Sequence, residues 1–172
     1  PFIDLLKTRV DVLYLDSPTD YRLDRLKGYP VWFKPLGSFA RSEMDNAFIR
    51  MTGGAEAKRT NIAVKGREVI IPSSAQGVAR FEFTDLCAAN LGAVDYLELA
   101  RTFHTIFIDN IPVLSPERRN EAIRFVNLID ALYEHKVKLL ASAEANPSEL
   151  YPLGDSAFEF RRTASRLHEM QS

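Results

Sequence analysis

The stretch RTFHTIFIDNIPVLSPERRNEAIRFVNLIDALYEHKVKLLASAEA (residues 101–145) decides the fold class of this chain. Residues 105–108 and 137–143 are short apolar runs of the kind found in buried strands. Between them, apolar residues recur at the helical i, i+3, i+4, i+7 spacing: Ala122, Phe125, Val126, Ile129, Leu132 and Tyr133. Ser115 and Pro116 supply an N-cap and a first-turn residue for that helix. A helix that connects two apolar strands predicts parallel pairing in an α/β layer.

Polar residues follow both predicted strands. Asp109 and Asn110 end the first strand, and Ser142 and Glu144 lie at the end of the second. The carboxyl ends of parallel strands face the crevice in which ligands usually bind. Asp109 also resembles the strand-end acid that holds magnesium in P-loop proteins. We therefore take Asp109, Asn110 and Ser142 as candidate cofactor-binding residues. The alternative is that Asp109 and Asn110 only form a turn before Pro112.

Other catalytic and binding motifs are absent from the sequence. No Gly is followed by Lys-Ser or Lys-Thr, so the chain lacks the G-x-x-x-x-G-K-[ST] phosphate cradle. The possible metal ligands are spread along the chain without ligand spacing: His104, His135, His168 and Cys87. We therefore expect no metal site. Ser142, Ser165 and Cys87 are nucleophiles by residue type alone, since none lies in a glycine-flanked elbow, and a hydrolase is the weakest hypothesis.

The remaining segments complete a mixed α/β (α+β) fold class. Residues 60–84 alternate apolar and polar side chains in three runs, with Gly66 and Gly77 in the connections, which predicts a small antiparallel β-meander. The apolar positions of these runs are Ile62, Val64, Val69, Ile71, Phe81 and Phe83. Residues 10–15 read as another buried strand. Residues 38–51, 96–103 and the last segment have helical spacing, and Gly53 with Gly54 ends the first of these helices.

Composition limits the function classes. The 172 residues carry a formal net charge of −1, so wrapping of a nucleic acid is not expected. The single Cys87 excludes an internal disulfide and fits a reducing compartment. No secretory signal and no membrane span is expected. The chain lacks an initiating Met and begins inside a predicted helix, so we expect it to be a segment of a longer protein.

Two arginines near the carboxyl end form a candidate anion site. Arg162 and Arg166 lie at i and i+4 on one helix face, with Arg161 beside them. Two guanidinium groups on one face repel each other unless they meet an anion. That anion is either a nucleotide phosphate, contacted in cis or in trans, or a carboxylate, for example Glu159 or Glu169.

Six phrases in order along the entire chain resemble the carboxyl-terminal half of the AFG-one-like P-loop ATPases. They are PFIDLLK (1–7), DYR (20–22), DYLELARTFHTIFIDNIPV (95–113), EAIRFVNLIDALYEHKVKL (121–139), SAE (142–144) and FEFRRTASRLHEMQS (158–172). The resemblance implies that ATP and magnesium bind the full-length protein through motifs in its amino-terminal half, and that neither binds this segment alone. Residues 1–16 would end that ATPase core. Residues 17–172 would form the family-specific region, with the meander at 60–84 and the α/β layer at 94–172.

The resemblance also implies a cellular setting. Bacterial members associate with the division ring and the inner membrane face, and eukaryotic members act in mitochondria on respiratory-chain proteins. The expected location is therefore cytoplasmic, peripheral to the inner membrane, or mitochondrial for a eukaryotic source. The expected partner is a division-ring or membrane-protein client, with homo-oligomerisation possible and no nucleic acid.

Two function hypotheses follow from these observations. In the first, the chain is the non-P-loop half of an AAA+-like ATPase and supplies a lid, arginine contacts and a partner-binding surface. Arg162, Ser165 and Arg166 fall on the family's F-x-R-x-x-S-R-L pattern, and we take Arg166, with Arg162, as a sensor or finger for the ATP phosphates. In the second, the chain is a nucleotide-independent protein-interaction module that binds its partner through the meander.

Overall fold

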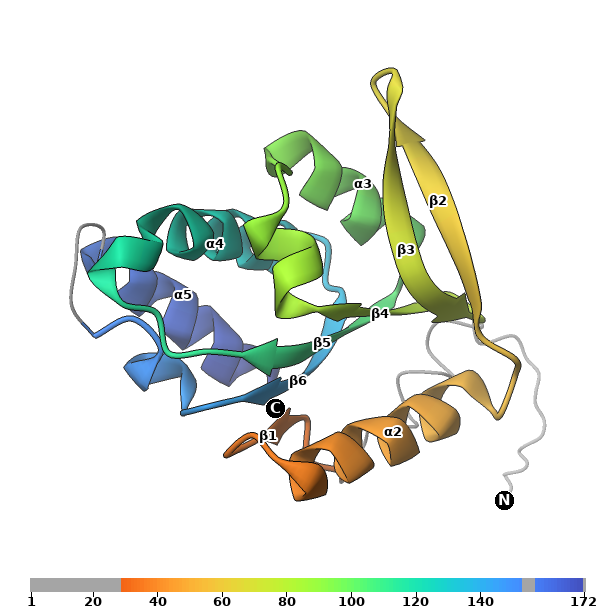
Figure 1. Ribbon diagram of the computed structural model, residues 1–172, viewed down its shortest axis with the longest axis horizontal. Coiled ribbons are helices and arrows are strands. Elements are labelled where there is room, and N and C mark those ends of the chain that lie inside the picture. Colours follow the sequence, from red (N-terminus) through yellow and green to blue (C-terminus); the bar gives the residue numbers. More distant parts are fainter. Residues whose placement is uncertain (1–28, 153–156, 172) are drawn as a thin grey trace.

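The computed structural model describes residues 29–152 and 157–171. Its centre is one six-stranded mixed sheet with the strand order β1-β6-β5-β4-β3-β2 (Figure 1). The fold class is thus mixed α/β, as predicted. The strand predicted at residues 10–15 and the proposed end of an ATPase core at residues 1–16 lie outside the described residues.

The parallel half of the sheet is the layer predicted from residues 101–145. β5 (Thr105–Ile111) pairs in parallel with β6 (Lys138–Ala143), which confirms the prediction. β1 (Trp32–Phe33) pairs in parallel with β6, and β4 (Val78–Glu82) with β5. Strand β5 continues past residue 108, where the register shifts and Asn110 adopts a left-handed φ of 62°. Asn tolerates this conformation better than most residues, so the strand bends at Asn110 instead of ending at Asp109.

The crossover helix begins later than Ser115 suggested. Pro116–Arg118 form a single 3₁₀ turn, and helix α4 (Arg119–Glu134) follows it. Ser115 precedes the 3₁₀ turn but donates or accepts no capping hydrogen bond through its side chain. Pro116 therefore starts a turn that leads into the helix, in keeping with its fixed φ and missing N–H.

The predicted meander is confirmed, although its third strand is shorter than expected. β2 (Lys58–Val64), β3 (Arg67–Ala75) and β4 pair as antiparallel neighbours. Both connections are two residues long with positive φ angles, 48° and 83° at Lys65 and Gly66 in the first turn, which matches the type I′ hairpin turn. Because β4 also pairs with β5, the meander and the parallel layer form one continuous sheet.

Phe83 was predicted to lie in the third strand of the meander, and this was wrong. Phe83 begins a helical turn that continues as a π-helix over Thr84–Ala88. The side chain of Asp85 accepts a hydrogen bond from the backbone N–H of Glu82 at 2.8 Å, which turns the chain at the end of β4. Phe83 then packs against Phe125 of α4, with ring centroids 5.8 Å apart.

Helices cover both faces of the sheet (Figure 1). On one face, α3 (Ala93–Thr102), α4 and α5 (Ala157–Met170) bury the larger core, which includes Ile106, Ile108, Phe125, Phe160 and Leu167. On the other face, α2 (Ser38–Thr52) packs Met44, Phe48 and Met51 over Phe107 and Leu140. As predicted, α2 ends at Gly53, which has the left-handed φ of 67°. Each fully buried large apolar side chain contributes about 1.5 to 3 kcal/mol.

Candidate functional site

A cleft of about 260 Å³ opens at the carboxyl edge of the parallel strands, beside the start of α2. Its lining includes Gly37, Asp45, Arg80, Asp109, Asn110 and Ser142. The three candidate cofactor-binding residues therefore lie in one cleft, because the ends of β5 and β6 are adjacent in the parallel register. Clefts that hold drug-sized ligands are typically about 300 to 1,000 Å³, and this one lies near the lower end of that range.

Arg80 is the central residue of the cleft. It alternates along β4 with Ala79 and Phe81, which belong to the larger core, so its side chain faces α2. Arg80 lies opposite Phe107 in the register, which makes Asp109, two residues further along β5, its diagonal neighbour. The guanidinium binds the Asp109 carboxylate through both oxygens, at 2.7 Å from Nε and 3.0 Å from Nη2.

A second carboxylate, from α2, also binds Arg80. Nη1 of Arg80 lies 2.8 Å from Oδ1 of Asp45, and the guanidinium lies 5.8 Å from the ring centroid of Phe48. Asp109 is 6% exposed, whereas 54% of the Asp45 side chain is exposed. Arg80 therefore joins α2 to the central strand through one buried and one solvent-facing ion pair.

The two carboxylates keep Arg80 charged. Burial by itself would lower the pKa of Arg80, but the hydrogen bonds and negative charges of Asp109 and Asp45 outweigh it and raise the pKa. Arg80 is consequently a permanent cation that lies directly against the strand-end acid Asp109. The charge of Asp109 is already balanced within the protein.

Asn110 and Ser142 line the cleft and are hydrogen-bonded to each other. The backbone N–H of Asn110 donates to Oγ of Ser142 at 2.8 Å, and its side-chain amide donates to Glu82 at 2.7 Å. These bonds connect the ends of β4, β5 and β6. Glu144, the other strand-end acid, accepts the backbone N–H of Val113 at 2.5 Å.

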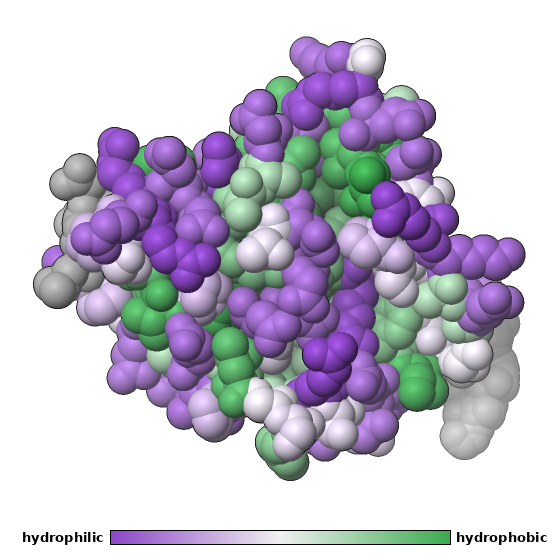
Figure 2. Space-filling model, viewed as in Figure 1, coloured by the Kyte–Doolittle hydropathy of each residue, from purple (hydrophilic) through white to green (hydrophobic). Residues whose placement is uncertain are grey.

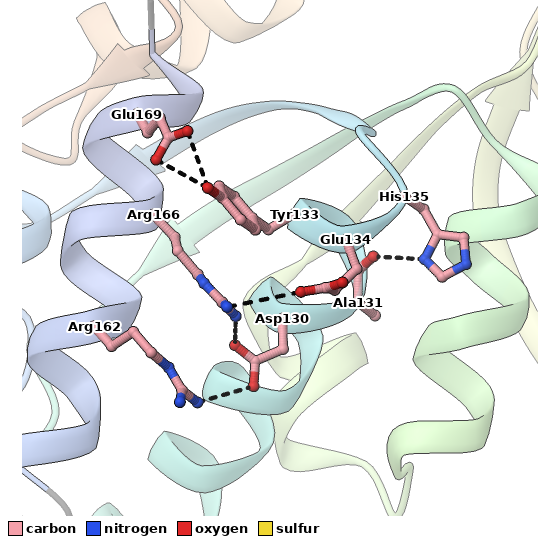
Figure 3. A network of polar contacts seen from close by, with 8 residues as sticks. All are labelled: Asp130, Ala131, Tyr133, Glu134, His135, Arg162, Arg166 and Glu169. Carbon is pink, nitrogen blue, oxygen red and sulfur yellow. Dashed lines mark hydrogen bonds and ion pairs between the residues drawn. The ribbon is translucent and has the colours of Figure 1, made fainter.

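The two predicted arginines lie on α5 and pair with α4, as Figure 3 shows. Arg166 binds Asp130 and lies 3.7 Å from the carboxylate of Glu134. Arg162 reaches the other oxygen of Asp130 at 3.5 Å, the limit of a hydrogen bond. The carboxylates that balance these arginines thus come from α4, and not from Glu159 or Glu169 of their own helix.

Tyr133 extends this network (Figure 3). The guanidinium of Arg166 lies 4.7 Å from the ring centroid of Tyr133, a cation–π distance. The Tyr133 hydroxyl donates to the carboxylate of Glu169 at 2.9 and 3.0 Å. This hydrogen bond, followed by slight burial, raises the pKa of Tyr133. The network holds α4 and α5 together by contacts along their exposed seam, which we call the α4–α5 seam.

The two sets of predicted site residues lie on opposite faces of the sheet. Asp109 lies on the face that α2 covers, where it binds Arg80, whereas Arg162 and Arg166 lie with α4 and α5 over the larger core. Sequence reasoning missed Arg80 and Asp45. A signal was available for Arg80, since the run VARFE places a charged residue between two apolar residues in the middle of a strand.

The potential nucleophiles are not activated. Cys87 is 1% exposed, and burial, followed by the negative charge of Glu121, raises the pKa of its thiol far above the usual value. Ser142 is 2% exposed and accepts the N–H of Asn110. Among residues 29–152 and 157–171, no group of three or more His, Cys, Asp or Glu side chains is placed to hold a metal ion. Within the same residues, no helix is long and apolar enough to cross a bilayer.

Comparison with known proteins gives a consistent set of relatives. The profile of the AFG1-like ATPases matches residues 1–172. Cell division protein ZapE of Escherichia coli K12 is 36% identical over 172 residues, which cover 100% of this chain and 46% of ZapE. An uncharacterized Schizosaccharomyces pombe protein is 36% identical over 158 residues, covering 91% of this chain and 35% of that protein.

A vertebrate relative completes the set. Lactation elevated protein 1 homolog B of Danio rerio is 32% identical over 180 residues, covering 99% of this chain and 34% of that protein. The chain spans less than half the length of each of these relatives. No solved structure matches it. Because the family profile matches every residue, the chain belongs to the AFG1-like ATPase family.

Proposed function

We propose that this chain is the part of an AFG1-like ATPase that lies outside the phosphate-binding loop, and that the full-length protein hydrolyses ATP with magnesium. Family membership over the whole chain supports the ATPase activity. The Arg80–Asp109 ion pair supports the proposal that magnesium and ATP phosphate bind in the other part of the protein. A carboxylate that already binds a permanent cation is a poor magnesium ligand, because the metal would have to displace the guanidinium or share its charge.

The cellular process we propose is cell division, the process in the name of the ZapE relative. A role in membrane-protein quality control is the alternative. In either process, this part of the protein would supply a lid and a surface for a protein partner. The expected location is the cytoplasm next to the inner membrane, or the mitochondrion in a eukaryote.

The proposed division of labour is tested by magnesium-ATP calorimetry on this chain beside the full-length protein. We expect heat of binding from the full-length protein and none from the chain. Asp109→Asn in the full-length protein should keep ATP turnover within a few fold of wild type, measured well below the melting temperature. Loss of turnover by about a hundredfold or more would instead make Asp109 a metal ligand.

We also propose that Arg166, with Arg162, contacts ATP phosphate in the assembled enzyme. For this contact, Arg166 would exchange Asp130 for phosphate, and both are anions that accept bidentate guanidinium bonds. Arg166→Ala should then reduce ATP turnover by about a hundredfold or more. Asp130→Ala, which breaks the same seam without removing the guanidinium, is the matched control and should leave turnover largely intact. Equal turnover in the two variants would assign Arg166 a structural role only.

A further inference from the structure

The β2–β3 hairpin has a long free edge. β2 is the last strand of the sheet order, and the opposite edge strand, β1, has only two residues. Five of the seven residues of β2 are exposed: Lys58, Arg59, Thr60, Asn61 and Ala63. Figure 1 shows the hairpin extending beyond the helices, and Figure 2 shows hydrophilic residues over its projecting end. The outer edge of β2 therefore presents backbone groups that pair with no described strand.

The charges along this edge have a simple pattern. Lys58 and Arg59 lie at one end of β2 and Lys65 lies in the turn at the other, with the uncharged residues 60–64 between them. None of these three cations forms an ion pair with a residue in the described part of the chain. Arg67 differs, because it binds the fully buried Asp95 at 2.7 Å and so anchors the turn to α3. One acid lies close to this edge, Glu68 of β3, which accepts a hydrogen bond from the side chain of Asn61 at 2.9 Å. Lys58, Arg59 and Lys65 outnumber it, so the edge carries a net positive charge.

We propose that the free edge of β2 binds an extended acidic segment of a partner protein by strand addition. Main-chain hydrogen bonds to the uncharged centre would supply affinity, and acidic residues at both ends of the segment would meet the cations for selectivity. A second copy of this chain does not fit. Antiparallel pairing of two β2 strands would bring Lys58 and Arg59 of one copy to the Lys65 end of the other, and like charges placed opposite each other destabilise a strand pair.

The hairpin geometry identifies which backbone N–H and C=O groups of β2 point outward and can pair with an added strand. In a two-residue hairpin, the residues that flank the turn, here Val64 and Arg67, form a hydrogen-bonded pair. Pairs alternate along the ladder, so Ala63 and Asn61 direct their N–H and C=O groups outward. Ala63 is exposed, and replacing it with Pro removes an outward N–H without breaking the bonds between β2 and β3.

The test uses the full-length protein without nucleotide and two fluorescently labelled peptides that share the central sequence TVTVT, DDTVTVTDD and KKTVTVTKK. We expect the fluorescence anisotropy of the acidic peptide to rise when the protein is added and that of the basic peptide to stay constant. Binding of the acidic peptide should be weaker at high salt. Ala63→Pro should weaken binding at least tenfold, whereas the matched variant Ala63→Thr, which keeps the N–H, should not. The double charge reversal Arg59→Glu with Lys65→Glu should reverse the preference to the basic peptide.

Several outcomes would overturn the proposal. These are equal binding of both peptides, full affinity in Ala63→Pro, or concentration-dependent dimerisation through β2 in sedimentation experiments. ATP turnover is measured in parallel, because none of these positions lies in the cleft or in the α4–α5 seam. If Ala63→Pro lost turnover by unfolding, the charge-reversed variant would decide the result, since it leaves the backbone unchanged.

Discussion

At the scale of single residues, Arg80 has two carboxylate partners that differ in burial, and this difference makes its role measurable. Asp109→Asn leaves a largely buried guanidinium with one partner, Asp45, so we expect the free energy of unfolding to fall by about 1 to 3 kcal/mol. Asp45→Asn is the matched control. More than half of that side chain is exposed, so its loss should cost about 0 to 1 kcal/mol.

Urea denaturation of the two variants and the wild type checks this prediction. Equal losses from Asp109→Asn and Asp45→Asn would mean that burial does not decide the strength of these ion pairs. The variants also separate structure from chemistry. A stability loss in Asp109→Asn with normal ATP turnover would fit a structural ion pair, whereas normal stability with lost turnover would fit a magnesium ligand.

At the scale of helices and strands, the α4–α5 seam is the second measurable unit. The side chains of Asp130 and Arg166 are 30% and 21% exposed, so water weakens their attraction. We expect Asp130→Ala and Arg166→Ala each to lower the free energy of unfolding by about 1 kcal/mol, and the double variant to lose little more than either single variant. Thermal or urea denaturation of the four proteins of this cycle measures the coupling. Fully additive losses would show that the pair is not coupled, and that Arg166 stabilises the fold through Tyr133 or Glu134 instead.

Sequence reasoning reached these elements because their periodicity is strong. The crossover helix, strands β5 and β6, the meander and helix α2 all follow from apolar spacing and from glycine in the turns. The site was harder to predict. The sequence placed Asp109, Asn110 and Ser142 at one edge, but their partners Arg80 and Asp45 lie 29 and 64 positions before Asp109 in the chain. Which strands are neighbours in the sheet determines such contacts, and the join between β4 and β5 was not predicted.

The partner of the two arginines on α5 could not be predicted for the same reason, since it lies on an element that is distant in the sequence. Helical spacing put Arg162 and Arg166 on one face of α5, and a neighbouring anion was expected. The structure places the carboxylate of Asp130 beside both arginines, 32 positions away from Arg162 on a packed helix. The wrong prediction at Phe83 has a local cause instead. Alternation predicted a strand there, but the hydrogen bond from the Glu82 N–H to Asp85 turns the chain into a π-helix.

At the scale of the whole molecule, the sheet combines a buried half and a peripheral hairpin, and this should produce two levels of stability. In β5, six of seven residues are buried, and in β6, five of six, whereas β2 buries only Val64. Amides of β5 and β6 should exchange hydrogen only when the whole protein unfolds. Those of β2 should exchange through local opening, with a lower free energy, because the hairpin has few buried side chains to hold it.

Native-state hydrogen exchange at increasing urea concentrations measures both levels. The exchange free energies of β5 and β6 amides should fall with the same slope as global unfolding, and those of β2 amides should hardly change until the two curves merge. The turn should be an exception within the hairpin, because Arg67 binds the buried Asp95, and Arg67→Ala should speed exchange at Val64 without changing β5. If β2 were as slow as β5, the hairpin would belong to the cooperative core, and strand addition would take place on a rigid edge. A locally opening β2 would instead be ordered by the added strand, and binding of the acidic peptide would then slow its exchange.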